Sequence, residues 1–351
     1  MQRLLTIAAM GLVAGCPVAA LAQAQPHEHN GVCCHETFPP DSIAVAGVPG
    51  AAIHPDVPEG YVLIEGDIQV RLADYLAYVN GADATFGTVT FWPVAPIAFD
   101  FAANVNATNQ QRAIDAMNAI AARVGVTFVA RTSQSNWIRF NDSTGNNSPV
   151  GMQGGQQTIN IVSWGSQFVI IHELYHSLGF WHEQSRPDRN TFVTINLANV
   201  CQNCCSGSSC NHNFNIVSGA TTYGAYDFDS FMHYDRLAFS VNGQNTIIVN
   251  QPFTSQWQNA IGQRNHFSYF DEITARGIYR FSFDRWWKPG AAGNTSGNLL
   301  NPMNNPTFAA AYNAAPAGVF MFIKDNANYP AVGTYSKAMT IQAPNGATLG
   351  N

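Results

Sequence analysis

The sequence predicts a protein of the α+β class, because it contains three helical patterns and, grouped between the first two of them, three short strand-like runs. A chain of 351 residues, 46% of them hydrophobic, can bury one core of ordinary size and still have residues left for terminal appendages. We therefore expect one principal domain that combines a sheet with helices.

The three helices are delimited by capping residues. The first is expected from Thr108, where Thr-Asn-Gln-Gln forms a capping box, to Gly125, and apolar residues recur between them at helical spacing. The second should cover residues 166–178 and end at Gly179. The third, over residues 268–279, opens with a Ser-Tyr-Phe-Asp capping signal.

The strand-like runs occupy residues 126–130, 137–140 and 158–162, and turn-rich Asn, Ser and Gly residues separate them. We expect these runs to form the sheet of the principal domain.

The composition indicates an extracellular protein that does not bind nucleic acid. Charged residues make up only 11% of the chain, compared with roughly 25% in an average soluble domain, and uncharged polar residues fill the surface instead. The net charge is −6, and no basic patch with interleaved aromatic residues is present. Nucleic acid is therefore excluded as a partner.

The first 22 residues have the pattern of an export signal. Arg3 supplies the positive end, residues 4–13 the apolar run, and Ala20-Leu-Ala22 or Ala22-Gln-Ala24 the cleavage site. A lipoprotein signal, with a lipid on Cys16, is the alternative, and we favour ordinary cleavage and secretion because the apolar run continues past Cys16. No other segment is long and apolar enough to span a membrane stably.

Six further cysteines fall into two groups. Cys33 and Cys34 lie near the start, and four more crowd into one loop, at Cys201, Cys204, Cys205 and Cys210. In an exported protein we favour disulfides over a structural metal in this loop. Three pairings of four cysteines exist, and the sequence does not choose among them.

Residues 172–182 read HELYHSLGFWH, a pattern suited to a catalytic metal. On a helix, His172 and His176 are four residues apart and share a face. Gly179 ends the helix, so that His182 can return as a third ligand. Three imidazoles leave one zinc coordination position open for water, and Glu173 beside that water suits the role of a general base.

The longer stretch of residues 172–189, HELYHSLGFWHEQSRPDR, resembles the astacin family of zinc endopeptidases, a branch of the metzincins. Glu183 after the third histidine is typical of that family and argues against another branch, such as the serralysins. Residues 230–234 resemble its Met-turn, and the motifs at 150–156, 238–240 and 261–264 also fit. The resemblance covers about residues 85–283.

The resemblance implies roles for several residues. Met232 would form the hydrophobic floor beneath one Zn²⁺, and Tyr234 would be a fifth zinc ligand that swings away to stabilise the oxyanion. Glu183 would be buried and linked to the new N-terminus after activation. The implied fold is a metzincin-like domain split by a cleft, with a twisted sheet and the zinc helix above and an irregular lower half that holds the Met-turn and the last helix.

A latency motif is implied as well. Residues 64–67, Ile-Glu-Gly-Asp, resemble the family's F-x-G-D motif, with Ile in place of Phe. A carboxylate from Asp67 on the fourth zinc position would displace the water and keep a zymogen latent. The tract that contains His27, His29, Cys33, Cys34 and His35 leaves a second mechanism open, in which a cysteine thiolate blocks the zinc.

The expected organisation is a signal peptide at 1–22, a propeptide at 23–84, a catalytic domain at 85–283 and a tail at 284–351. Residues 23–60 lack a sustained period and read as a flexible leader. All three lysines lie beyond residue 284, and weak alternation there predicts the start of a β-rich module. Activating cleavage, by another protease or by autocatalysis, is expected between residues 73 and 91, around Gly81 and Gly87.

The sequence departs from the astacin pattern in its cysteines, and one alternative function stays open. The family's usual disulfides join distant parts of the domain, whereas here the cysteines crowd into 201–210, a loop that we expect to be stapled locally. Protein or peptide substrates are expected to lie extended along an edge strand near residues 137–140. The alternative from another functional class is a non-catalytic, zinc-containing adhesin whose tail binds glycans, which Glu173 disfavours because a structural site has no use for a general base.

Overall fold

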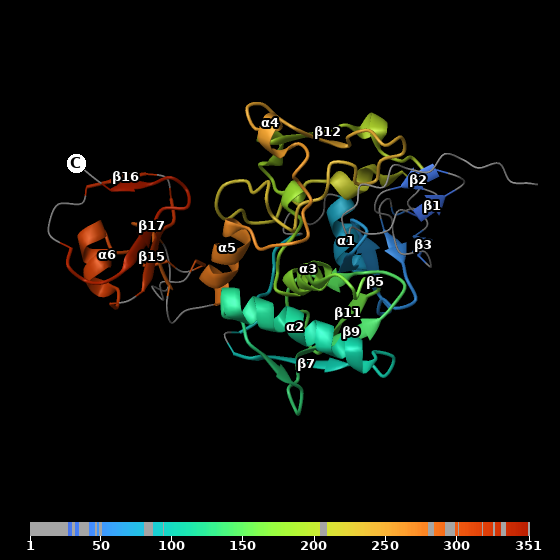
Figure 1. Cartoon of the computed structure of the whole chain (residues 1–351), viewed down its shortest axis with the longest axis horizontal. Coiled ribbons are helices and arrows are strands. Elements are labelled where there is room, and N and C mark those ends of the chain that lie inside the picture. The colour runs from blue at the N-terminus through green and yellow to red at the C-terminus, as the bar shows by residue number, and fades with distance from the viewer. Residues whose placement is uncertain are drawn as a thin grey trace, which may run out of the picture.

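The computed structural model describes most of the chain after residue 41 and two short segments before it (Figure 1). The described residues are 27–29, 32–34, 42–45, 48, 51–80, 87–93, 95–203, 209–279, 284–291, 299–300, 302–317, 319–325, 327–330 and 335–349. Several sequence-based expectations fall outside them, namely those for the signal peptide, Cys16, His35, Gly81, Cys204 and Cys205. Within the described residues, no helix is long and apolar enough to cross a membrane.

The principal sheet has four parallel strands in the order β11-β9-β7-β8. The strands are β7 (Ile97–Phe101), β8 (Phe128–Ala130), β9 (Trp137–Asp142) and β11 (Gln156–Ile161). The three strands expected from the sequence are therefore confirmed, with shifts of up to two residues at their ends. The expectation that 137–140 forms an edge strand is wrong, because β9 lies between β11 and β7.

Two helices, α2 (Ala107–Val124) and α3 (Gln167–Ser177), pack against each other and share one hydrophobic core with this sheet. In Figure 1, α2 runs beside α3, and α3 also contacts β11. The α2 helix begins earlier than expected, because the side chain of Asn106, rather than that of Thr108, accepts the N–H of Asn109 at 3.0 Å. It ends as expected at Gly125, which is in the left-handed conformation with φ +84°.

The part of the chain expected to form the propeptide contributes a second sheet. Its five strands follow the order β10-β6-β5-β4-β3 and are β3 (Ile43–Ala44), β4 (Ala52–Ile53), β5 (Tyr61–Ile64), β6 (Ile68–Arg71) and β10 (Ser148–Pro149). The α1 helix (Leu72–Val79) follows β6. The interpretation of residues 23–60 as a flexible leader is wrong for β3 and β4, because strands of two residues are too short to show a period.

The chain after α3 is mostly irregular. Its described residues form four short 3₁₀ helices, the antiparallel pair β12 (Val193–Ile195) and β13 (Ile247–Val249), and the single turn α4 (Thr254–Trp257). The 3₁₀ helices are Glu183–Ser185, Arg189–Thr191, Leu197–Asn199 and Cys210–Phe214. An apolar cluster holds this region together and includes Phe214, Tyr234 and Phe239, all of which are buried.

The last helix of this region, α5 (Tyr269–Tyr279), begins as the sequence predicts. The Ser268 hydroxyl accepts the N–H of Asp271 at 3.0 Å, and the Asp271 carboxylate accepts the N–H of Ser268 at 3.3 Å. Ile273 and Ile278 then point into the same core as α2 and α3. The helix thus packs against α2 in the core of the principal domain.

The C-terminal residues pack against α5 (Figure 1). The elements are β14 (Asp284–Trp287), α6 (Phe308–Ala314), β15 (Phe320–Ile323), β16 (Asn328–Tyr329), β17 (Thr340–Gln342) and β18 (Thr348–Leu349). Strands β14, β15 and β17 form a parallel sheet, and β16 pairs with β18. The Leu299 N–H donates to Gly277 O at 2.8 Å, so contact with α5 includes the backbone.

The chain's first described segment is a small hairpin of β1 (His27–His29) and β2 (Val32–Cys34). These strands pair antiparallel, with Cα partners His27 and Cys34 at one end and His29 and Val32 at the other. The structure therefore describes the backbone of residues 27–29 and 32–34 of this His- and Cys-rich tract, and the thiolate alternative for latency stays untested.

Candidate metal centre

The α3 helix and the turn after it bring the three predicted histidines together. His172 and His176 lie on successive turns of α3, and Ser166 caps the helix by accepting the N–H of Val169 at 3.4 Å. The chain turns at Gly179, where φ is +102° and an added Cβ would lie 2.7 Å from Val89 Cγ1. A side chain there would be strained and would clash, so glycine is required for His182 to return to the helix.

The Nε2 atoms of the three histidines converge. Nε2 of His172 lies 3.1 Å from Nε2 of His176 and 3.3 Å from Nε2 of His182. Two nitrogens bound tetrahedrally at about 2.0–2.1 Å from one zinc ion would lie about 3.3 Å apart. All three histidines are buried, with at most 3% of their surface exposed. The donor set therefore fits a zinc ion.

Hydrogen bonds of the Nδ1 atoms fix the orientation of the His172 and His176 rings. Nδ1 of His172 lies 2.9 Å from Phe231 O, and Nδ1 of His176 lies 2.7 Å from Phe180 O. A carbonyl oxygen can only accept, so each Nδ1 donates and each Nε2 keeps its lone pair for a metal. Burial lowers the pKa of His172 to about 4 and that of His176 well below its usual value, which favours the neutral, ligating form.

Asp67 approaches the same point from the strand turn between β5 and β6. Its Oδ2 lies 3.2 Å from Nε2 of His182, 3.3 Å from that of His172 and 3.9 Å from that of His176. Its Oδ1 has no hydrogen-bond partner among the described residues. Burial opposes ionisation of Asp67, but the histidines outweigh it and hold its pKa below the usual range. The four side chains form a group that could hold a metal ion.

Glu65, two residues before Asp67, supports His182. Its Oε2 lies 2.7 Å from Nδ1 of His182 and accepts the Ser185 hydroxyl at 3.0 Å. Burial would lower the pKa of His182, but the carboxylates of Asp67 and Glu65 outweigh it and raise the pKa to about 9. The sequence places Glu65 within the latency motif but gives it no role, since a single sequence does not indicate which side chain will face His182.

Glu173 follows His172 on α3 and is also buried, with 1% of its surface exposed. Its Oε2 has no hydrogen-bond partner in the part of the chain that the structure describes. Burial, together with the charge of Asp67, raises its pKa well above the usual value. A buried carboxyl with one free oxygen and a raised proton affinity is suited to accept and return a proton.

Tyr234 and Met232 lie beside the histidines, in the segment predicted to be the Met-turn. The Tyr234 ring centroid lies 4.5 Å from that of His182, and its hydroxyl donates to Glu65 O at 2.5 Å. In this structure the phenol is thus engaged by the segment that carries Asp67. Met232 is buried in the core that includes α3, and its carbonyl oxygen accepts the N–H of Glu183 at 3.0 Å.

Glu183 lies on the wall of a cavity of about 240 Å³ that also reaches His182 and Met232. Its Oε1 accepts Nη1 of Arg186 at 2.9 Å and the N–H of Asp227 at 2.8 Å. Burial raises the pKa of Glu183 to about 8, although Arg186 opposes the shift. About 15% of the Glu183 side chain is exposed, so Glu183 is half-buried, and its expected link to a new N-terminus stays a prediction.

Asp271 on α5 is a supporting residue that the sequence did not reveal as part of the site. Its carboxylate accepts the Ser230 hydroxyl at 2.6 Å and the N–H of Phe231 at 3.1 Å. Phe231 in turn presents its carbonyl to His172. Burial and the charge of Asp227 raise the pKa of Asp271 to about 7. The α5 helix therefore supports the first histidine through the backbone of the Met-turn.

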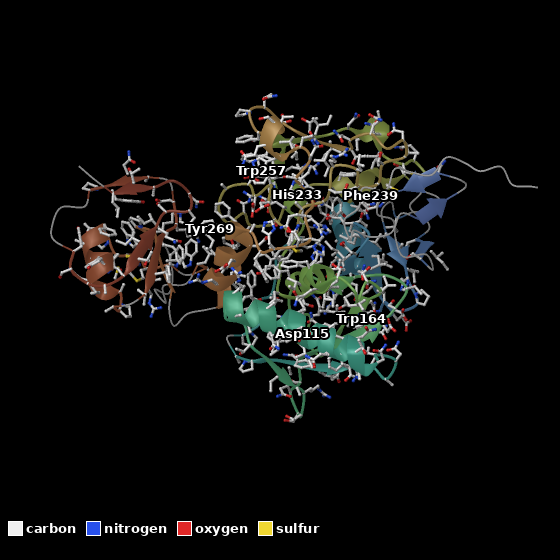
Figure 2. All side chains as sticks on the ribbon, in the orientation of Figure 1. Asp115, Trp164, His233, Phe239, Trp257 and Tyr269 are labelled. Carbon is white, nitrogen blue, oxygen red and sulfur yellow. The ribbon has the colours of Figure 1, made fainter. Side chains whose placement is uncertain are left out.

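His233, which sequence reasoning also passed over, is the histidine labelled in the upper part of Figure 2. Its Nδ1 donates to Tyr234 O at 2.6 Å, and its Nε2 accepts the Tyr226 hydroxyl at 2.7 Å. It lies next to Tyr234 in sequence but does not belong to the group of converging metal-ligating side chains. It holds the backbone of Tyr234 in place.

Comparisons with known proteins agree with this geometry. Residues 85–280, more than half of the chain, match the Astacin peptidase family. Zinc metalloproteinase nas-4 of Caenorhabditis elegans is 30% identical over 250 residues, which cover 69% of this chain and 74% of that protein. High choriolytic enzyme 1 of Oryzias latipes is 37% identical over 166 residues, 47% of this chain and 58% of that protein.

Other relatives match over a smaller share of their own length. Meprin A subunit beta of Rattus norvegicus is 30% identical over 226 residues, 63% of this chain, and the chain spans only 30% of that protein. Among solved structures, that of high choriolytic enzyme 1, a hatching enzyme zinc-protease from the medaka fish Oryzias latipes, aligns with a TM-score of 0.47 at 32% identity, over 54% of this chain and 92% of that chain. The family match covers more than half of the sequence and includes α3 and the three converging histidines. The chain therefore belongs to the astacin family of zinc metallopeptidases.

Proposed function

We propose that this protein is a secreted zinc endopeptidase that is synthesised as a zymogen and kept latent by Asp67. One observation carries the proposal: the carboxylate of Asp67 lies within 3.9 Å of the Nε2 atoms of all three histidines. From there Asp67 would take the coordination position that a catalytic zinc needs for water.

The proposed zinc ligands are His172, His176 and His182, whose spacing fits a tetrahedral site. When bound, zinc supplies Lewis acidity, which lowers the pKa of a water to about 7 and polarises the scissile carbonyl. The protein's own contribution is to hold three imidazoles in one orientation through Phe231 O, Phe180 O and Glu65. A latent form needs the same ligands with Asp67 in addition.

Glu173 is the proposed general base. Its unpartnered Oε2 would accept a proton from the attacking water, and the same carboxyl would then deliver a proton to the leaving amine. Tyr234 is the proposed fifth ligand and oxyanion donor. Its hydroxyl is bonded to Glu65 O here, so removal of the propeptide would free this phenol to donate to developing negative charge. Met232 would form the apolar floor of the site.

The proposed substrates are extended peptides or proteins that bind beside β10. At present β6 of the propeptide pairs in parallel with β10, and the Ser148 N–H donates to Asp67 O at 2.9 Å. Nε2 of Gln69 also donates to Thr158 O of β11 at 3.0 Å. Departure of β6 would expose these backbone groups for a substrate strand, in place of the edge that the sequence predicted at β9.

Several parts of the proposal concern processing. We retain a signal peptide at 1–22, a propeptide at 23–84, a catalytic domain at 85–283 and a tail at 284–351. Cleavage near Gly87, by another protease or by the enzyme itself, would create an N-terminus close to the cavity that Glu183 lines, because Gly87 lines that cavity too. An ammonium group there could pair with the Glu183 carboxylate.

Disulfides in the loop of residues 201–210 are also proposed. Cys201 and Cys210 are both buried, and the Cys210 N–H donates to Cys201 O at 2.9 Å. Neither residue carries a free thiol. These observations support local staples in an exported protein, while the pairing stays open because Cys204 and Cys205 lie outside the described residues.

Peptide hydrolysis by the purified protein tests the proposed function. Casein or a peptide library is incubated with the precursor and with the trimmed protein, each with and without a zinc chelator, and Glu173→Gln is the matched control because it keeps size and burial. We expect activity only in the trimmed, zinc-loaded protein, and loss of that activity in the variant. A trimmed, zinc-loaded protein that cleaves nothing would favour the adhesin alternative instead.

A further inference from the structure

The three converging histidines differ in what supports their outer nitrogen. For His172 and His176 the partner of Nδ1 is a backbone carbonyl within residues 180–231, inside the family-matched part of the chain. For His182 the partner is the carboxylate of Glu65, which belongs to the expected propeptide. The third histidine therefore depends on a segment that activation removes.

Glu65 is held in this place by several contacts. Only 4% of its surface is exposed, and its Oε2 receives both the His182 ring and the Ser185 hydroxyl. Its carbonyl oxygen receives the Tyr234 hydroxyl. Its backbone has φ +53°, a left-handed conformation that a residue with a side chain adopts only when its surroundings enforce it. Contacts to its side-chain carboxylate and to its backbone carbonyl thus hold Glu65 in place.

The two acidic residues of the turn contact opposite sides of the same ring. Asp67 Oδ2 lies 3.2 Å from Nε2 of His182, and Glu65 Oε2 lies 2.7 Å from Nδ1. Asp67 therefore lies on the side of the ring where the metal would bind. Glu65 lies on the side where a carboxylate orients a metal-bound imidazole and makes it a better donor.

We propose that Glu65 is a positioning residue for His182, so that the propeptide completes the zinc site as well as blocking it. The precursor would then bind zinc more tightly than the processed enzyme for a reason separate from Asp67. Loss of an outer partner of a metal-bound histidine typically weakens metal binding about 10–100-fold. The propeptide would in this way help the newly folded chain to load its metal. This inference rests on the proposed zinc ligands and on the proposed propeptide.

The test compares zinc dissociation constants, measured by competition with a chromophoric chelator on full-length precursors. Glu65→Gln keeps the size of the side chain and removes its charge, and Glu65→Ala removes the contact. Glu59→Gln is the matched control, because Glu59 is an exposed acid of the same segment. All of these variants keep Asp67, so the contribution of that carboxylate is equal in each.

We expect Glu65→Gln and Glu65→Ala to weaken zinc binding about 10–100-fold, with the larger loss for Ala, and Glu59→Gln to match the wild type. After trimming and removal of the propeptide, all variants should give the same dissociation constant, because they then share one sequence. This second measurement also detects a variant that has misfolded. Equal zinc affinity of the Glu65→Ala and wild-type precursors would overturn the inference.

The outcomes for this inference and for the proposed enzyme are separable. Trimmed wild-type protein that cleaves peptides, together with unchanged zinc affinity in the Glu65 variants, would refute only the positioning role. Weakened zinc affinity in those variants, together with a trimmed protein that cleaves nothing, would refute only the endopeptidase.

Discussion

The contact between α5 and the C-terminal residues can be tested at Gly277. A Cβ added to Gly277 would lie 2.7 Å from Nε1 of Trp286 and 2.8 Å from Cβ of Leu299. Both neighbours are buried, with 3% and 2% of their surface exposed, so neither can easily move away. Gly277→Ala is therefore expected to force a shift at the joint between α5 and β14.

Two effects of opposite sign determine how much Gly277→Ala changes the free energy of unfolding. Overpacking of a well-packed site costs about 1–3 kcal/mol. Alanine in a helix interior is favoured over glycine by about 1 kcal/mol. Because two side chains lie closer than 3.0 Å to the added atom, we expect the upper part of the first range and a net loss of about 1–2 kcal/mol. Without the contact, the same substitution would stabilise the protein.

The test is therefore whether Gly277→Ala lowers or raises the free energy of unfolding. Thermal and urea unfolding of full-length protein would be followed by tryptophan fluorescence, with Glu173→Gln in every sample to prevent self-cleavage. Gly165→Ala is the control, since no atom lies within 4 Å of its added Cβ. Trp286→Phe should relieve part of the penalty in the double variant. A Gly277→Ala protein as stable as its parent, or more stable, would refute the packing described here.

Three further predictions follow from the site and its surroundings. Asp67→Ala should give a precursor that cleaves peptides before trimming, and a precursor that stays fully latent would contradict the aspartate mechanism. Burial and Asp227 raise the pKa of Asp271 to about 7, above its unfolded value of 3.8, so its contribution to stability is present below about pH 4 and disappears as the pH rises through 7. The free energy of unfolding should therefore fall more steeply over this interval in the wild type than in Asp271→Asn, as urea titrations at several pH values would show. Finally, alkylation of the unreduced, denatured protein should leave Cys201 and Cys210 unlabelled in mass spectra, and labelling of either would exclude its disulfide.

The sequence was most informative where a local signal and a chemical motif coincide. Ser268 caps α5, Gly125 ends α2 and Gly179 ends the turn after α3, and each does so through its own backbone or its near neighbours. The spacing of His172, His176 and His182 similarly reflects helix geometry. Such features depend on few residues and can be read from one sequence.

The missed features depend on contacts between distant residues. The position of β9 inside the sheet follows from its pairing with β7 and β11, which strand propensity does not reveal. Strands β3 and β4 are too short to show alternation and are held by pairing with β5. Glu65 meets Ser185 across 120 residues, and Asp271 meets Phe231 across 40. No local pattern predicts such partners.

The line of contacts from Asp271 through Phe231 to His172 has a consequence for biosynthesis. Chain growth is directional, so Asp67 and the α3 histidines leave the ribosome long before α5 does. A nascent chain that ends before Asp271 contains every metal-binding side chain but lacks the carboxylate that holds the Phe231 backbone. The metal site can therefore reach its final geometry only after almost the whole principal domain has been synthesised. The propeptide is synthesised first, so it is already present when the site forms.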